Sequence, residues 1–215
     1  MTTGLLNANL KNMTSLIVVG NAPVENNHES LVDTADCVVR FNKCENYGKN
    51  TGTKTDILVL GNLGAHSLDW SKDNKLSSFP FWREISEIWF PRDRDIYIKY
   101  RDIYTNKIID QAPPGPINDY KNHIIAGNKI SAEIICLPKE VNEFSFLLLS
   151  CLCDNPFSMP STGFLTLMYI LTCERFSNYK IGLIGFGFSG WDGHPWSAER
   201  EAVAKFEASG QVIRY

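Results

Sequence analysis

The sequence has no excess of basic residues and no long hydrophobic run. Its 215 residues carry 24 acidic and 21 basic side chains, a net charge of −3, whereas nucleic-acid-binding domains usually carry a basic excess. A bilayer-spanning helix needs about 18 apolar residues, and the runs Phe144–Cys153 and Phe164–Cys173 are shorter. The first 16 residues lack the basic and apolar regions of a signal peptide. We therefore expect a protein that binds no nucleic acid and contacts a membrane at most peripherally.

Motifs for metals and common nucleotide cofactors are also absent. There is no CxxC pair, no cysteine and histidine set at zinc spacing, no GxGxxG and no GxxxxGK[ST], so we expect no structural metal, dinucleotide or nucleoside triphosphate. The six cysteines follow no secretion signal in a chain large enough to build its own core. This favours free thiols in a reducing compartment. We therefore expect the protein in the cytoplasm, a location that includes the inner face of the membrane.

Short apolar strands alternate with helical stretches along the chain. This order predicts one α/β domain over residues 1–215, a three-layer arrangement around a mostly parallel sheet. A loop, insertion or lid is expected over Tyr97–Asn128, which contains the run Pro113–Pro116. The predicted strands are Leu16–Val19, Cys37–Phe41, Asp56–Leu60, Glu87–Phe90, Lys180–Phe186 and Gln211–Tyr215, and the predicted helices are Glu29–Thr34, Lys139–Cys153, Ser161–Phe176 and Ser197–Ser209.

Polar residues follow the first two predicted strands. Gly20-Asn21 follows the first and Asn42 the second, and ligands of open parallel sheets bind beyond the carboxyl ends of the strands. Glycine allows close approach to the backbone, and asparagine offers a donor and an acceptor. A ligand contact is expected for Asn42, while Gly20-Asn21 is either a ligand contact or a plain turn.

Arg40 lies within the apolar second strand. A cation there needs a partner, and the candidates are Asp33, Asp36 or a bound phosphate. We expect a structural ion pair with one of the carboxylates.

Pro160-Ser161-Thr162-Gly163 stands directly before a helix-length apolar segment. Ser161 or Thr162 can cap that helix, and the free amides of the first turn together with the helix dipole favour an anion. A phosphate or carboxylate site and a plain helix cap are both open at this point.

His194 lies in a loop between glycine, proline and two tryptophans, just before a predicted helix. Histidine is the usual general base near neutral pH. Glu199 falls in the first turns of the next helix, where its carboxylate suits the dipole and can reach back to the imidazole. The alternative is an incidental loop histidine.

These segments follow one another in the order of a known set of motifs. They are Val19-Gly20-Asn21, Val32-Asp33, Asp36, Val38–Asn42 and Gly52–Thr55, then Pro160–Gly163, Cys173 and Gly185-Phe186-Gly187, and last His194 and Glu199. The set resembles the eukaryotic-type sialyltransferase family, glycosyltransferase family 29, and its bacterial relatives. The matches span about residues 16–62 and 160–199.

The resemblance implies an inverting, metal-independent glycosyltransferase of GT-A-like fold, without a cofactor. Such an enzyme transfers a sugar acid from a CMP donor to a hydroxyl of a glycan or glycolipid. A bacterial relative would use CMP-sialic acid or CMP-Kdo in lipopolysaccharide or capsule biosynthesis. His194 would deprotonate the acceptor, and the implied donor-binding residues are Gly20, Asn21, Asn42, Ser161, Thr162, Gly163, Gly185 and Phe186.

Two departures from the family pattern stand out. Leu16 lies near the place of the cysteine that pairs with the counterpart of Cys173 in the animal enzymes, so that bridge is not expected. The interval from Gly187 to His194 holds no second histidine. The group that assists the departing phosphate is therefore unassigned.

Two other functions compete with this interpretation. Asp93-Arg94-Asp95, after the fourth predicted strand, can hold Mn²⁺ or Mg²⁺ in a glycosyltransferase that uses a UDP- or GDP-sugar. We favour the alternative, in which Arg92-Asp93-Arg94-Asp95 is a solvated charged turn. The missing second histidine motivates a non-catalytic module that binds a nucleotide or glycan.

Overall fold

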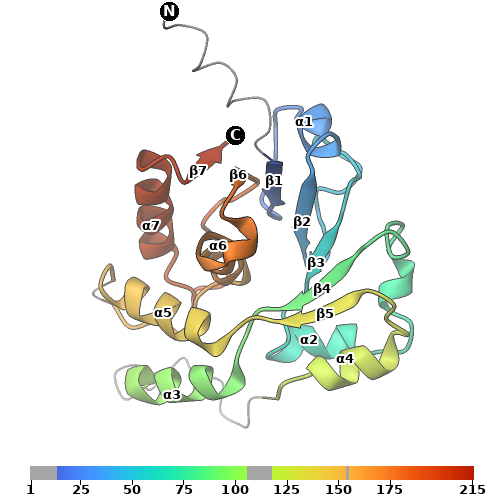
Figure 1. Cartoon of the computed structure of the whole chain (residues 1–215). Helices are drawn as coiled ribbons and strands as arrows, with labels where there is room; N and C mark the ends of the chain where they lie inside the picture. The colour runs from blue at the N-terminus through green and yellow to red at the C-terminus, as the bar shows by residue number, and fades with distance from the viewer. Residues whose placement is uncertain (1–13, 106–117, 154) are drawn as a thin grey trace, which may run out of the picture.

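The protein is built on a seven-stranded parallel sheet with helices on both faces (Figure 1). The computed structural model describes residues 14–105, 118–153 and 155–215. The strand order is β5-β4-β3-β2-β1-β6-β7, and every neighbouring pair is parallel. The three-layer α/β fold predicted from the sequence is confirmed. The strands are β1 (Thr14–Val19), β2 (Cys37–Phe41), β3 (Ile57–Val59), β4 (Glu87–Phe90), β5 (Glu133–Cys136), β6 (Tyr179–Ile184) and β7 (Val212–Arg214).

The helices form the two outer layers. Those whose apolar residues join the larger core cluster are α3 (Arg94–Thr105), α5 (Lys139–Ser150), α6 (Thr162–Thr172) and α7 (Trp196–Ala208). The other face is covered by α1 (Glu29–Asp33), α2 (Ala65–Trp70) and α4 (Lys121–Gly127). Two short 3-10 helices, η1 (Leu76–Ser78) and η2 (Glu174–Phe176), complete the described elements.

Alternate residues of each central strand enter opposite layers. In β1, Leu16 and Val18 pack into the cluster beneath α6, whereas Ile17 and Val19 pack against the α1 side. Since successive side chains of a strand point to opposite faces, continuous apolar strands such as these are needed where both faces are covered. The sheet is therefore held between two apolar layers, and its carboxyl edge is fixed relative to the start of α6.

The predicted loop over Tyr97–Asn128 is wrong at both of its ends, where the structure has helices. Helix α3 runs to Thr105, with Tyr97 and Tyr100 buried, and α4 covers Lys121–Gly127. The proline run that suggested a loop belongs to residues 106–117, which lie outside the described residues.

The predicted partner of Arg40 is also wrong. Its guanidinium is buried and donates to three backbone carbonyls, those of Thr51 (2.6 Å), Gly52 (3.1 Å) and Lys54 (3.0 Å), and to the Thr51 hydroxyl. Asp33 instead accepts from the amides of Thr53 and Lys54. Arg40 thus fixes the loop between β2 and β3 through its carbonyls, because a fork of donors suits several oxygens that converge.

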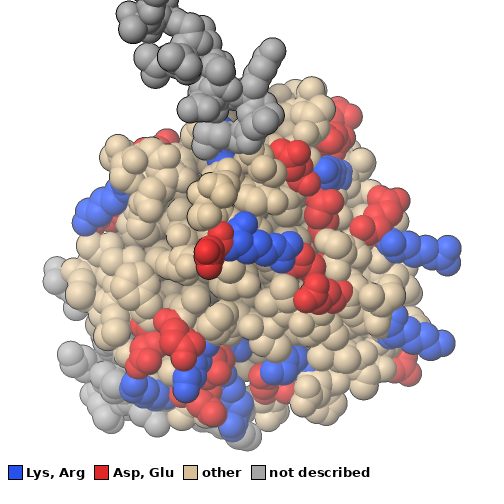
Figure 2. All heavy atoms as spheres, in the orientation of Figure 1, with Lys and Arg blue, Asp and Glu red and all other residues tan. Residues whose placement is uncertain are grey.

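Three further expectations concern thiols, membranes and charge. All six cysteines, each within the described part of the chain, are free. None of the described helices has the length and apolar character required to cross a membrane. On the face shown in Figure 2, acidic and basic side chains are interspersed.

Candidate active site

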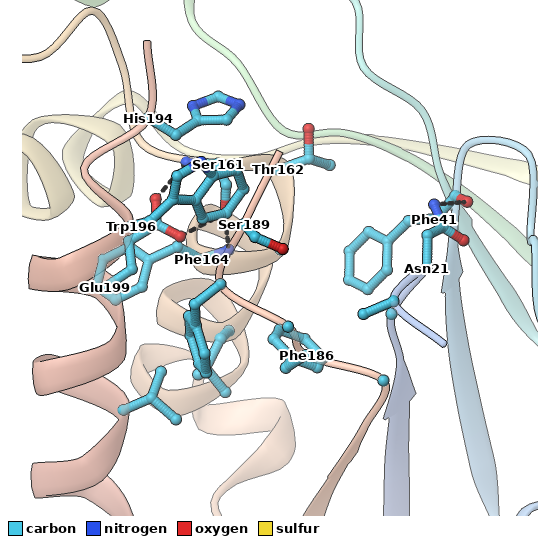
Figure 3. A pocket seen from close by; sticks show the side chains of 18 of the residues that line it. Asn21, Phe41, Ser161, Thr162, Phe164, Phe186, Ser189, His194, Trp196 and Glu199 are labelled. Atoms are coloured by element: carbon cyan, nitrogen blue, oxygen red, sulfur yellow. Dashed lines mark hydrogen bonds between the residues drawn. The ribbon is translucent and has the colours of Figure 1, made fainter. Parts of the chain in front are cut away.

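A cavity of about 450 Å³ opens where the carboxyl ends of β1, β2 and β6 meet the start of α6 (Figure 3). Parallel strands bring their carboxyl ends to one edge, where ligands of such sheets bind. The structure brings together every donor-binding and catalytic residue implied by the motif resemblance. The cavity is lined by Gly20, Asn21, Asn42, Ser161, Thr162, Gly163, Gly185, Phe186 and His194, and also by Glu199.

The floor of the cavity depends on two glycines in contact. The Gly20 amide donates to Ile184 O at 2.7 Å, and a Cβ on Gly20 would lie 2.2 Å from Gly185 O. Gly185 itself has a φ of +69°, which favours glycine. The ends of β1 and β6 therefore approach each other closely, which a side chain at either glycine would prevent.

The two asparagines use their amides to hold the strand ends together. Asn21 donates to Phe41 O at 3.1 Å and accepts from the Glu45 amide at 3.0 Å. Asn42 has a φ of +48°, and its Oδ1 accepts from the Gly61 amide at 2.9 Å. Both therefore shape the wall of the cavity.

Ser161 is the N-cap of α6. Its Oγ accepts from the Phe164 amide at 3.1 Å, so the cap predicted from the sequence is confirmed. Among the described residues, no acceptor bonds the amides of Thr162 and Gly163, which are the first two of the helix. Two free donors at the positive end of the helix dipole thus remain beside the cavity.

Glu199 is bound to Ser161 and does not hold the imidazole. Its carboxylate accepts from the Ser161 amide at 2.6 Å and from the Ser161 hydroxyl at 2.7 Å. The side chain is 1% exposed. Burial raises the pKa of Glu199 to about 7, against the opposing effect of the Ser161 hydrogen bonds and the charge of Arg92. Glu199 therefore joins α7 to the start of α6, and the suggestion that it reaches back to His194 is wrong.

His194 is oriented by a backbone carbonyl. Its Nδ1 lies 2.8 Å from Met159 O, and since a carbonyl can only accept, Nδ1 carries the hydrogen and Nε2 keeps a lone pair. Trp191 and Trp196 flank the ring edge-on, each with its centroid 4.9 Å away. Burial, followed by the charge of Arg92, lowers the pKa of His194 to about 4. The imidazole is therefore neutral at pH 7.

Arg92 is the residue of this region that the sequence analysis missed. It follows β4 directly after Pro91, and its charge acts on both His194 and Glu199. The rule that located Asn21 and Asn42 could also have located Arg92, because Arg92 is likewise a polar residue just beyond the carboxyl end of a parallel strand. Interpreting residues 92–95 as one charged turn concealed it.

Asp93 and Asp95 lie outside the cavity lining. Asp93 caps α3, because its Oδ1 accepts from the amides of Asp95 (3.0 Å) and Ile96 (2.9 Å). The Asp95 side chain is 90% exposed. Within the described residues, no group of three or more histidine, cysteine, aspartate or glutamate side chains is placed to hold a metal ion.

Comparison with known proteins finds relatives by sequence and by structure. No family model matches the chain. The "Urease operon 23 kDa accessory protein" of Rhizobium meliloti (strain 1021) is 26% identical over 204 residues, which are 93% of this chain and 91% of that protein. Two crystal structures of a mammalian sialyltransferase, one in complex with Gal-beta-1-3GalNAc-ortho-nitrophenol, superpose with TM-scores of 0.57 (the complex) and 0.59. Both are 18% identical to this chain and cover 98% of it and 72% of their own chains. The chain has a sialyltransferase-like fold.

Proposed function

We propose that the protein is an inverting glycosyltransferase that moves a sugar acid from a CMP-sugar to a hydroxyl of a glycan or glycolipid. One observation carries the proposal. Residues from separate segments of the chain, chosen from the sequence by strand-end position, helix capping and motif resemblance, line a single cavity at the carboxyl edge of the sheet. The sialyltransferase-like fold supports the same class of reaction.

The proposed reaction is a single displacement. The acceptor oxygen forms a bond to the anomeric carbon while the bond from that carbon to the phosphate oxygen breaks, and CMP departs with the electron pair. His194 Nε2 takes the acceptor proton. The free amides of Thr162 and Gly163 face the phosphate or the sugar carboxylate. CMP is already a good leaving group, so the protein mainly positions the reactants and supplies a base.

A low pKa suits His194 for this role in one respect and limits it in another. The free base is fully available at pH 7, but it is a weak base while the site is empty. A bound CMP-sugar acid brings negative charge next to the imidazole, and an anion nearby raises a histidine pKa. The donor thus shifts the base toward the range in which proton transfer is efficient.

The test is a comparison of donors by thermal shift, followed by product analysis. CMP, CMP-sialic acid and CMP-Kdo should each raise the melting temperature, because a ligand that binds only the folded state stabilises it. UDP-glucose serves as the matched control and should give no shift. Release of CMP that depends on a glycan acceptor would support transfer. Binding of CMP without transfer or donor hydrolysis would favour the non-catalytic module.

A second candidate function follows from the named relative. The match to the urease operon accessory protein covers more than nine-tenths of both chains. If this chain acts as an accessory protein of a urease, urease activity in cells should fall on deletion of its gene. That activity should return with a His194→Ala variant, which the transferase proposal predicts to be inactive.

A further inference from the structure

The backbone around Arg92 is fixed by two buried asparagines. Asn62 accepts from the Arg92 amide at 3.1 Å and donates to the Arg92 carbonyl at 2.9 Å. Asn142 donates to Pro91 O at 3.0 Å and accepts from the Asp93 amide at 3.1 Å. Asn62 is 0% exposed and Asn142 2%. Four hydrogen bonds therefore fix the three residues after β4, which is more than a surface turn requires.

The guanidinium that these hydrogen bonds position lacks a hydrogen-bond or ion-pair partner among the described residues. Arg92 Nε is shielded from solvent, and no hydrogen-bond acceptor reaches it in the described part of the chain. None of the ion pairs between described residues includes Arg92. Burial lowers the pKa of Arg92 to about 10, so the group stays cationic at neutral pH. A half-buried cation with a shielded Nε and no counter-ion among the described residues is costly, and such a cost is typical of a group kept for a ligand.

Arg92 does not itself line the cavity, but its guanidinium lies close to two residues that do. Arg92 Nη1 lies 3.2 Å from the point that a Cβ on Gly61 would occupy. Asn42 Oδ1 and Thr162 Oγ1, both from cavity-lining residues, lie 3.5 Å and 3.9 Å from the same point. A side chain at Gly61 would therefore crowd these three atoms. The charge of Arg92 also acts on His194 and Glu199, on the other side of the helix start.

We propose that Arg92 binds the phosphate of the nucleotide donor and stabilises it as it departs. The inference rests on the proposed function. The phosphate would accept from the Arg92 guanidinium on one side and from the Thr162 and Gly163 amides on the other. When the bond to the anomeric carbon breaks, the phosphate gains negative charge, and a cation already in place stabilises that charge. Arg92 would thus assist the departing phosphate, a role for which the sequence offers no second histidine.

The test is binding of cytidine, CMP and inorganic phosphate by calorimetry. Arg92→Gln should lower the affinity for CMP and for inorganic phosphate about tenfold or more, because a charge-assisted contact is lost, and should leave cytidine unchanged. Arg92→Lys, which keeps the charge, should retain part of the CMP affinity. The matched control is Arg83→Gln, at an exposed arginine in the turn before β4. Arg92→Lys also provides the comparison if the glutamine variant does not fold.

The remaining outcomes separate the two proposals. Unchanged CMP affinity in Arg92→Gln overturns the inference, and a loss confined to the complete CMP-sugar acid assigns Arg92 to the sugar carboxylate instead. If the wild type binds neither CMP nor cytidine but binds phosphate through Arg92, the proposed function fails while the anion site stands. If it binds no phosphate either, both fail.

Discussion

His194 owes its chemical state to its immediate neighbours. The Met159 carbonyl fixes the hydrogen on Nδ1, and the two tryptophans and Arg92 keep the ring neutral. We expect His194→Ala to lower turnover about a hundredfold or more, because the acceptor proton loses its base, while CMP affinity stays nearly unchanged. The measurements are the rate of acceptor-dependent CMP release and calorimetry with CMP. His123→Ala, at an exposed position on α4, is the control. An equal loss of CMP binding would contradict the role of base.

Glu199 and His194 make opposite contributions to the pH dependence of stability. The pKa of Glu199 is raised from 4.5 to about 7, so its contribution is complete below pH 4.5 and is lost as the pH rises through 7. The pKa of His194 is lowered from 6.5 to about 4, so its contribution is complete above pH 6.5 and is lost as the pH falls through 4. Each of these two contributions amounts to about 3 kcal/mol of the free energy of unfolding. In the wild type they largely cancel.

Single variants should reveal each contribution. Glu199→Gln removes the contribution of Glu199 and keeps that of His194. The free energy of unfolding of this variant should therefore fall as the pH drops from 7 to 4. His194→Ala removes the contribution of His194 and keeps that of Glu199. The free energy of unfolding of this variant should therefore rise over the same interval. Urea unfolding at four pH values measures both, and the other titrating groups are common to the two variants. Parallel pH profiles would show that the two side chains do not titrate as described.

At the scale of elements, the site depends on how closely β1 and β6 approach at their ends. Gly20→Ala would place a Cβ 2.2 Å from Gly185 O. The strands must then separate, and we expect a loss of stability of about 1–3 kcal/mol together with weaker CMP binding. Thermal melting and calorimetry check both effects. Gly210→Ala is the control, because nothing lies within 4 Å of its Cβ and only its φ of +76° opposes the change. Equal losses in the two variants would show that the close approach is unimportant.

The success of sequence reasoning differed from element to element. The central strands were predictable because both of their faces are buried, which makes them continuously apolar. The edge strand β5 was missed because its apolar run, Ile134–Leu137, is short, and three of the four strand residues are exposed rather than packed in the core. The strand-end rule located Asn21 and Asn42 but not the bonds they make, because those depend on the Phe41 carbonyl and the Gly61 amide from other segments.

The buried hydrogen-bond partners were the least predictable part of the site. Glu199 and Ser161 are 38 residues apart, and His194 and Met159 are 35 apart. No local periodicity connects such positions. Arg40 and Arg92 are a second example. Backbone carbonyls accept from the guanidinium of Arg40, whereas Arg92 Nε has no hydrogen-bond partner among the described residues. Composition and spacing do not distinguish these two environments.

At the scale of the whole molecule, the open question is whether the site acts with or without a metal. The two aspartates that offered a metal site are separated from the cavity, one as the cap of α3 and the other exposed to solvent. Arg92 Nη1, in contrast, lies 3.2 Å from the position of a Cβ on Gly61, beside Thr162 Oγ1 and Asn42 Oδ1 of the cavity wall. On our proposal, this arginine would supply the fixed positive charge that a divalent ion supplies in a metal-dependent enzyme.

Chelation of divalent metal ions tests whether the intact protein needs a metal for transfer. If Arg92 and the helix start neutralise the phosphate, EDTA should leave acceptor-dependent CMP release unchanged, and added Mn²⁺ or Mg²⁺ should not increase it. Asp95→Asn should likewise be without effect, since its side chain is 90% exposed and lines no part of the cavity. The rates are to be compared at one ionic strength, because salt screens the same charges. Loss of activity in EDTA that Mn²⁺ restores would instead require a metal bound with the donor.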